Sequence, residues 1–180
     1  MRIQKQEAQK IIDELGIMPI LESIGDARVV GSVALDVIVK LDIDIHVVVE
    51  DLFSAIDKIY RHLISNDNIS EVKIKDFGGN SGILVGVNEY KTKQGVWSID
   101  FWVTTDEKTT GFADVQKLLK DMTQEHKEII VQIKNEYCSK FGDTSNGLSP
   151  KIYQAVVYEG VKDFETFMEV QILKQPPEQS

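Results

Sequence analysis

The stretch from residue 29 to residue 49 (VVGSVALDVIVKLDIDIHVVV) constrains the fold of this 180-residue chain more than any other. It ends in a run in which acidic and β-branched residues alternate from Asp42 onward. Side chains of a strand point alternately to its two faces, so Asp42, Asp44 and His46 share one face. The other face carries the apolar residues Ile43, Ile45, Val47 and Val49. We therefore predict a strand that buries one face in a core and holds two carboxylates on the other.

The two carboxylates of this strand need a partner or open solvent. Residues two apart on one face of a strand lie roughly 6–7 Å from each other. Like charges about 4 Å apart repel by about 4 kcal/mol at an effective dielectric constant of 20, and by less at the longer spacing. Mg²⁺ prefers oxygen ligands and is often held by one or two carboxylates together with substrate phosphates. Asp42 and Asp44 are therefore candidate Mg²⁺ ligands, and a solvated polar face is the alternative.

Gly31 and Ser32 end the preceding apolar run, and nine residues separate Ser32 from Asp42. A glycine at the end of a strand permits a sharp turn and the close approach of a ligand. If a short helix follows, its first N–H groups and the hydroxyl of Ser32 can bind a phosphate. The same stretch therefore offers a phosphate site and a carboxylate pair, with a plain turn as the alternative for its first half.

This combination resembles the signature of the polymerase-beta-like nucleotidyltransferase superfamily, in which a strand ends in Gly-Gly or Gly-Ser and Asp-apolar-Asp-apolar follows shortly after. In that superfamily a third acidic residue lies between apolar residues on a later strand. Asp100, between Ile99 and Phe101, matches it. The resemblance covers roughly residues 27–103. It implies a small mixed β-sheet with flanking helices, and a C-terminal helical region that closes the cleft.

The resemblance also implies the chemistry of these residues. Two Mg²⁺ ions hold the nucleoside triphosphate, Asp42 and Asp44 bind the ions, and Gly31 and Ser32 bind phosphate. Asp100 completes the metal site and helps to activate the attacking hydroxyl. In such in-line phosphoryl transfer, metal ions stabilise the attacking and leaving oxygens, and a carboxylate takes up the proton.

Further residues are candidates for the same site. Lys40, two residues before Asp42, could reach a phosphate, and a solvated lysine is the alternative. Lys151 and Tyr153 open a C-terminal helix, from which the superfamily often takes a lysine or a tyrosine to contact the nucleotide. His46 shares the face of the aspartates, but we expect it to be packed or exposed rather than a ligand.

Apolar periodicity predicts the remaining elements. Helices are expected over residues 2–15, 18–24, 51–64, 112–141, 149–158 and 163–173, and strands over residues 26–30, 42–49, 71–77, 83–90 and 96–104. This order is that of an α+β domain. We expect a nucleotidyltransferase-like catalytic core over residues 1–110, a helical region over residues 111–174 and a flexible tail over residues 175–180.

Charge narrows the expected partners. The chain has 20 basic and 29 acidic side chains, which give a net charge of −9. Proteins that bind nucleic acid usually carry a basic stripe, because their affinity comes from neutralised phosphates. The sequence has no such stripe, so we expect no nucleic-acid partner. A local basic pocket for one triphosphate would not show in the overall charge.

Hydropathy and cysteine content indicate the compartment. No apolar run is long enough to span a bilayer, and the N-terminal residues lack the apolar segment of a signal peptide, so we expect no membrane contact. The single cysteine, Cys138, excludes an intramolecular disulfide. That suits a reducing, cytoplasmic environment.

These features together predict a Mg²⁺-dependent nucleotidyltransferase. It would move a nucleoside monophosphate from an NTP, ATP for example, to a hydroxyl of a small molecule such as an antibiotic, or of a protein. Two alternatives stay open: a toxin-neutralising member that nucleotidylates a partner protein, and a nucleotide-binding or interaction module of the same fold without catalysis. The oligomeric state also stays open, with a homodimer as one alternative.

Overall fold

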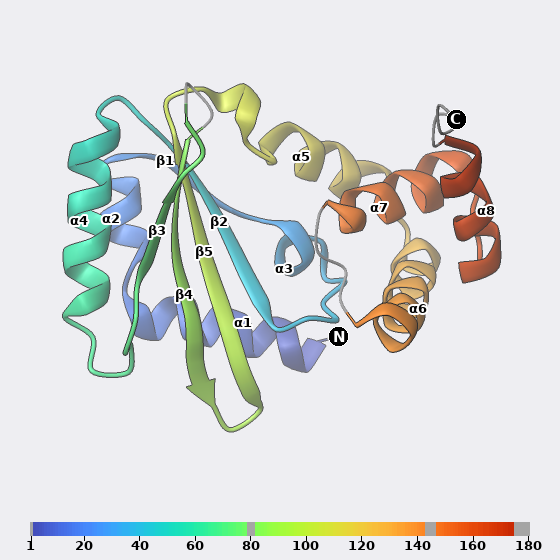
Figure 1. The fold of residues 1–180 in the computed structure, drawn as a ribbon, viewed down its shortest axis with the longest axis horizontal. Helices are drawn as coiled ribbons and strands as arrows, with labels where there is room; N and C mark the ends of the chain where they lie inside the picture. Colours follow the sequence, from blue (N-terminus) through green and yellow to red (C-terminus); the bar gives the residue numbers. More distant parts are fainter. Residues whose placement is uncertain (1, 79–81, 143–146, 175–180) are drawn as a thin grey trace, which may run out of the picture. The chain divides into compact units, whose positions relative to one another are not determined.

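The computed structural model describes residues 2–78, 82–142 and 147–174. Its centre is a five-stranded mixed sheet in the order β1-β2-β5-β4-β3 (Figure 1). The strands are β1 (Gly25–Val30), β2 (Asp42–Val49), β3 (Lys73–Asp76), β4 (Ile83–Thr92) and β5 (Gly95–Thr104). β2 and β5 are parallel, and the other neighbouring pairs are antiparallel. The flexible tail predicted over residues 175–180 lies outside the described residues.

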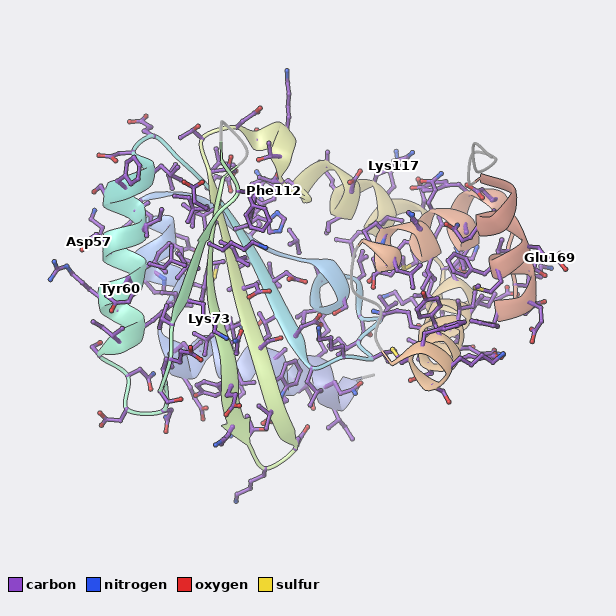
Figure 2. All side chains as sticks on the ribbon, viewed as in Figure 1. Asp57, Tyr60, Lys73, Phe112, Lys117 and Glu169 are labelled. Carbon is purple, nitrogen blue, oxygen red and sulfur yellow. The ribbon has the colours of Figure 1, made fainter. Side chains whose placement is uncertain are left out.

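Three helices pack on one face of this sheet. They are α1 (Arg2–Leu15), α2 (Met18–Glu22) and α4 (Leu52–Ile64), which lie on the same side of the strands (Figure 1). Residues of all three helices and of the central strands form one hydrophobic core, whose fully buried members include Ile11, Leu21, Ile59, Leu63, Ile43, Ile45, Val85, Ile99 and Phe101. Asp57 and Tyr60 of α4 lie on the side of that helix that faces away from the sheet (Figure 2).

The alternation of β2 decides which face of the sheet is free of this core. Its residues are alternately partly buried and fully buried from Asp42 to Val49, as the sequence predicts. The apolar residues of β2 enter the core beneath the helices, and the polar residues stand on the opposite face. The predicted α+β fold, with a small mixed sheet and flanking helices, is thereby confirmed.

The chain divides into two compact units, Met1–Gln116 and Lys117–Ser180. Helix α5 (Phe112–Asp121) crosses this boundary, and the second unit contains α6 (Gln124–Phe141), α7 (Leu148–Glu159) and α8 (Phe164–Lys174). None of the helices in the described ranges combines the length and the apolar composition that crossing a bilayer requires.

Residues 112–141 form two helices, where the sequence predicts one. The break lies at Thr123, whose hydroxyl accepts a hydrogen bond from the backbone N–H of His126 at 3.2 Å. The Nδ1 atom of His126 accepts in return from the backbone N–H of Thr123 at 3.3 Å. This reciprocal capping box satisfies N–H groups at the start of a helix, so α6 begins anew here. Apolar periodicity continues across the break and conceals it.

Candidate active site

The two parallel central strands bring the three predicted carboxylates onto one face. Asp44 of β2 is in register with Asp100 of β5, and Asp42 is in register with Ser98. Adjacent strands are about 4.8 Å apart, so Asp44 and Asp100 are direct neighbours despite their separation in sequence. All three aspartates are partly buried, and they stand on the face opposite the helix-covered core.

Gly31 makes the turn that places a backbone against this face. It is the first residue of the short helix α3 (Gly31–Leu35), and its φ of +63° lies in the left-handed region that favours glycine. A Cβ atom at this position would lie 2.5 Å from Oδ2 of Asp44. Only a residue without a side chain fits beside that carboxylate, so Gly31 and Asp44 form one structural unit.

Ser32, the next residue, contacts Asp42, the other aspartate of β2. Its side chain is buried, and its hydroxyl donates a hydrogen bond to Oδ1 of Asp42 at 3.2 Å. This bond orients the carboxylate of Asp42. The role in phosphate binding that the sequence suggested for Ser32 stays a prediction, and the backbone N–H groups at the start of α3 are the other donors of this turn.

The carboxyl group of Asp100 has a perturbed electrostatic environment. Burial raises the pKa of its carboxyl group, and the negative charge of Asp42 raises that pKa further, whereas the positive charge of Lys40 lowers it. Lys40 is exposed but thus lies close enough to act on Asp100. Because proton transfer is most efficient when the pKa of the base approaches the working pH, a raised pKa suits Asp100 to accept a proton.

Gly86 of β4 makes room for the same carboxylate. It is in register with Asp100, and a Cβ atom on Gly86 would lie 2.9 Å from Oδ1 of Asp100. The Asp100 carboxylate therefore leans over β4. A glycine in the middle of a strand often marks such a close approach. The position of Gly86 within an apolar run was therefore a sequence signal that could have marked Gly86 as part of the site.

His46 is packed, as expected, and its ring is bonded to the backbone. Its Nδ1 atom accepts a hydrogen bond from the backbone N–H of Gly111 at 3.0 Å. Burial lowers the pKa of His46 to about 4. The ring is therefore neutral near pH 7 and fixes the segment before α5 to the sheet.

Lys151 and Tyr153 belong to the second unit, on α7. Lys151 is exposed, and Tyr153 is buried. The Tyr153 hydroxyl accepts a hydrogen bond at 3.4 Å from Nζ of Lys134, a buried lysine of α6 that the predictions from sequence did not include. A lysine directly after the apolar residues Ile129, Ile130 and Ile133 was the available signal. That Lys151 and Tyr153 contact a nucleotide stays a prediction.

The donor set of the sheet face suits a divalent cation held jointly with a substrate. Among the residues that the structure describes, no three or more histidine, cysteine, aspartate and glutamate side chains are grouped so that they could hold a metal ion. Mg²⁺, however, keeps several waters and is usually bound by one or two carboxylates plus substrate phosphates rather than by an all-protein cage. The carboxylates of Asp42 and Asp44, one oriented by Ser32 and the other set against Gly31, fit that requirement.

Solved structures share this fold, although no protein-family model and no curated protein sequence matches the chain. A cytoplasmic RNA terminal U-transferase matches with a TM-score of 0.63 at 13% identity, over 87% of this chain and 49% of that one. The GLD-2–GLD-3 non-canonical poly(A) polymerase complex matches with a TM-score of 0.67 at 13% identity, over 87% and 53%. The Cid1 poly(U) polymerase with MgGTP bound matches with a TM-score of 0.59 at 12% identity, over 81% and 45%.

The same comparison contradicts the prediction that no nucleic acid is a partner. The proteins that share the fold are an RNA terminal U-transferase, a poly(U) polymerase and a poly(A) polymerase. Net charge was the wrong guide, because it averages over the whole surface, whereas a chain end can be bound by a small local group of cations and aromatic rings.

The matches are limited in extent and in identity. This chain spans about half the length of these solved structures, 49% and 53% in the first two. At identities of 12–13% the likeness establishes the fold. It agrees with the Gly-Ser turn before α3 and with the carboxylates of β2 and β5 on one face. The chain therefore has the fold of the polymerase-beta-like nucleotidyltransferases.

Proposed function

We propose that this chain transfers a nucleoside monophosphate from an NTP to a hydroxyl group and releases pyrophosphate. One observation carries the proposal: Asp44 and Asp100 are in register on adjacent parallel strands, with Asp42 on the same face. Three carboxylates gathered on a sheet face that the core leaves free are unfavourable unless they bind something positive. The divalent cation that accompanies an NTP supplies that charge.

Different residues of the chain bind the cation and the phosphates in this proposal. Asp42 and Asp44 hold the divalent cation, Mg²⁺, and Ser32 keeps Asp42 oriented. The bound cation supplies stabilisation of the charge on the attacking and leaving oxygens. The backbone N–H groups at the start of α3 and the ammonium group of Lys40 are the candidates for phosphate binding. These assignments continue the predictions made from the sequence.

Asp100 serves as the general base. It accepts the proton of the acceptor hydroxyl, whose oxygen forms a bond to the α-phosphorus of the NTP. The bond from that phosphorus to the oxygen that bridges the α and β phosphates breaks, and pyrophosphate leaves with the electron pair. The raised pKa of Asp100 supports this role, because a stronger base holds the proton better as the new bond forms.

The 3′ hydroxyl of an RNA is the first candidate acceptor, since the solved structures that share this fold include a cytoplasmic RNA terminal U-transferase and a non-canonical poly(A) polymerase. A hydroxyl of a small molecule, such as an antibiotic, or of a protein is the second candidate. The net charge of −9 favours it, because an acidic surface attracts a cationic amino-alcohol.

Two differently labelled NTPs test the proposal. Each NTP is supplied with Mg²⁺ and carries its label in the α or the γ phosphate. A single-stranded RNA, a panel of amino-alcohol antibiotics and a protein lysate are the acceptors. We expect the α label to join an acceptor and the γ label to appear in pyrophosphate. Transfer of the γ label would contradict the proposal. Binding of NTP without any transfer would indicate the catalytically silent module.

A matched pair of variants shows whether the transfer belongs to this site. Asp44→Asn removes one charge from the carboxylate face, and we expect it to abolish transfer. Asp57→Asn removes a charge from the exposed side of α4, where Asp57 is paired with Arg61, and it should transfer at the wild-type rate. Equal loss in both variants would point to a general effect on the protein and not to the site.

A further inference from the structure

The face that carries the carboxylates continues beyond Asp100 across β4 and β3. Gly86 of β4 is in register with Asp100, and Lys73 of β3 is in register with Gly86. Residues opposite each other on neighbouring strands point to the same face. Lys73 therefore stands on the carboxylate face, two strands from Asp100 and on the side toward which the Asp100 carboxylate leans.

The next row of the same face adds two aromatic rings and a second lysine. Trp102 of β5 is in register with Leu84 of β4, which is in register with Lys75 of β3. The ring of Phe77, directly after β3, meets the ring of Trp102 edge to face, with centroids 5.3 Å apart. Nζ of Lys75 lies 4.6 Å from the centroid of Phe77. We call Lys75, Phe77 and Trp102 the aromatic corner.

The aromatic corner is held in place and yet accessible. The indole N–H of Trp102 donates to the hydroxyl of Thr109 at 3.4 Å. A Cβ atom on Gly82 would lie 2.8 Å from the Trp102 ring, so backbone packs closely against the indole. Phe77 is 49% exposed, so its ring is accessible to a ligand.

We propose that the aromatic corner binds the terminal nucleotide of a single-stranded RNA acceptor and so places its 3′ hydroxyl beside Asp100. The inference rests on the proposed function, whose acceptor it specifies. Trp102 lies two residues from Asp100 on one face of β5, roughly 6–7 Å along the strand, within the span of one nucleotide. Aromatic rings stack on bases of any sequence, and cations beside them bind the backbone phosphates.

Charge selects RNA over the other acceptors. Lys73 and Lys75 both stand on this part of the face. Lys73 is paired with Glu71 at 3.7 Å, but both side chains are exposed, so the pair is weak and leaves the lysine available. Lys75 contacts the ring of Phe77, so its positive charge lies beside the ring on which a base would stack. These two cations can attract a phosphate backbone, a group that a cationic amino-alcohol lacks.

Binding in the absence of NTP and metal tests the inference directly. A short single-stranded RNA with a fluorescent label at its 5′ end is titrated with protein in EDTA at low salt, and its anisotropy is followed. We expect Phe77→Ala and Lys75→Gln each to weaken binding by about fivefold to a hundredfold, the range for loss of one stacked base or its cation. Wild-type affinity in both variants would overturn the proposal.

Matched control variants remove the same groups from the other side of the sheet. Phe53→Ala deletes a ring of α4 that is 77% exposed, more than Phe77. Lys10→Gln removes a surface lysine of α1 that is paired with Glu14. Both should bind RNA as the wild type does. Weakening by Phe53→Ala or Lys10→Gln to the same degree would show that binding is not local to the aromatic corner.

Tryptophan fluorescence gives a second readout of stacking. The chain has two tryptophans, and Trp97 is fully buried in the core, so quenching by bound RNA reports on Trp102. We expect single-stranded RNA to quench the emission and a blunt RNA duplex to do so much less, because its bases are already stacked. Unchanged emission on saturation with single-stranded RNA would contradict base stacking at Trp102.

The two proposals can fail separately. If the protein binds no RNA but transfers the α label to a small molecule or a protein, the aromatic corner is not an RNA site and the proposed function stands. If RNA binds through Lys75 and Phe77 but no nucleotide is ever transferred, the aromatic corner is an RNA site, whereas the proposed function and the role of that RNA as its acceptor both fail.

Discussion

Asp42, Asp44 and Asp100 are like charges on one face of the sheet, and their mutual repulsion opposes folding. The charge of Asp42 is one cause of the raised pKa of Asp100, second only to burial. Binding sites often carry destabilisation of this kind, because residues are selected there for function rather than for stability. Removal of one of these charges should therefore separate stability from function.

Asp42→Asn makes this separation measurable. Asparagine keeps the shape and can still accept the hydrogen bond from Ser32, but it removes a negative charge. Without metal, the variant should melt at the wild-type temperature or higher, with a gain of up to about 2 kcal/mol. With Mg²⁺ and NTP at a hundred times Kd, the wild type gains about 2.7 kcal/mol and the variant much less. Thermal melts with and without Mg-NTP measure both effects. Strong destabilisation of the metal-free variant would instead show that Asp42 is a structural residue.

His46 should make the stability of the fold depend on pH. Its pKa is about 4 in the folded protein and ordinarily about 6.5. Between these values the unfolded chain binds a proton that the folded protein excludes, so the stabilisation is complete above pH 6.5 and is lost as pH falls to 4. The effect is on the order of 3 kcal/mol. Denaturant melts of wild type and His46→Asn across this range should diverge; parallel curves would contradict a buried, neutral His46.

The elements of the first unit differ in how far the sequence predicts them. β2 could be placed from its alternation, which also assigned its aspartates to one face, because burial of one face follows from period two. The glycine within the apolar run of β4 marks a close approach. That its neighbour is Asp100 could not be predicted, because this depends on the register of β4 against β5. In the second unit, the capping box at Thr123 could not be recognised from the sequence either. Its N3 residue is His126, whereas a capping box usually has glutamate or glutamine at N3.

The turn between β1 and α3 offers a test with an internal control. Gly31 and Gly16 have nearly the same φ, +63° and +60°, but only Gly31 would bring a Cβ atom against Asp44, whereas Gly16 has open space. Gly16→Ala should lower the free energy of unfolding by about 1 kcal/mol through the left-handed backbone alone. Gly31→Ala should lower it by more, because its Cβ atom also displaces the Asp44 carboxylate. Gly31→Ala alone should also abolish stabilisation by Mg-NTP. Retained stabilisation in Gly31→Ala would separate this turn from the site.

At the scale of the whole molecule, the net charge is negative, but one part of the sheet surface carries two neighbouring positive charges. The chain carries −9 overall, yet Lys73 and Lys75 stand together on the face beyond Asp100. Sequence composition reported the first quantity and missed the second, because strand pairing decides which charges share a surface. Because the rest of the protein surface is acidic overall, it should repel the RNA backbone. We therefore expect the protein to bind only the terminal nucleotides of an RNA.

The salt dependence of RNA binding measures this confinement. Each neutralised phosphate of a single strand contributes about −0.7 to the slope of log K against log salt concentration. One or two phosphates at Lys75 and Lys73 predict a slope of about −0.7 to −1.4, and Lys75→Gln should make it shallower by about 0.7. Anisotropy titrations over a range of salt concentrations give the slope. A slope several times steeper would show that RNA follows a long basic surface rather than this local one.

The measurement that tests the central claim most directly is the rate of pyrophosphate release from Mg-NTP by Asp44→Asn, by Asp100→Asn and by the double variant. If the two in-register carboxylates act as one catalytic unit, each single substitution lowers the rate by about a hundredfold or more, and the double variant is hardly slower than the worse single one. Release at the wild-type rate in any of the three, with Mg-NTP still bound, would contradict a catalytic site on this face of the sheet.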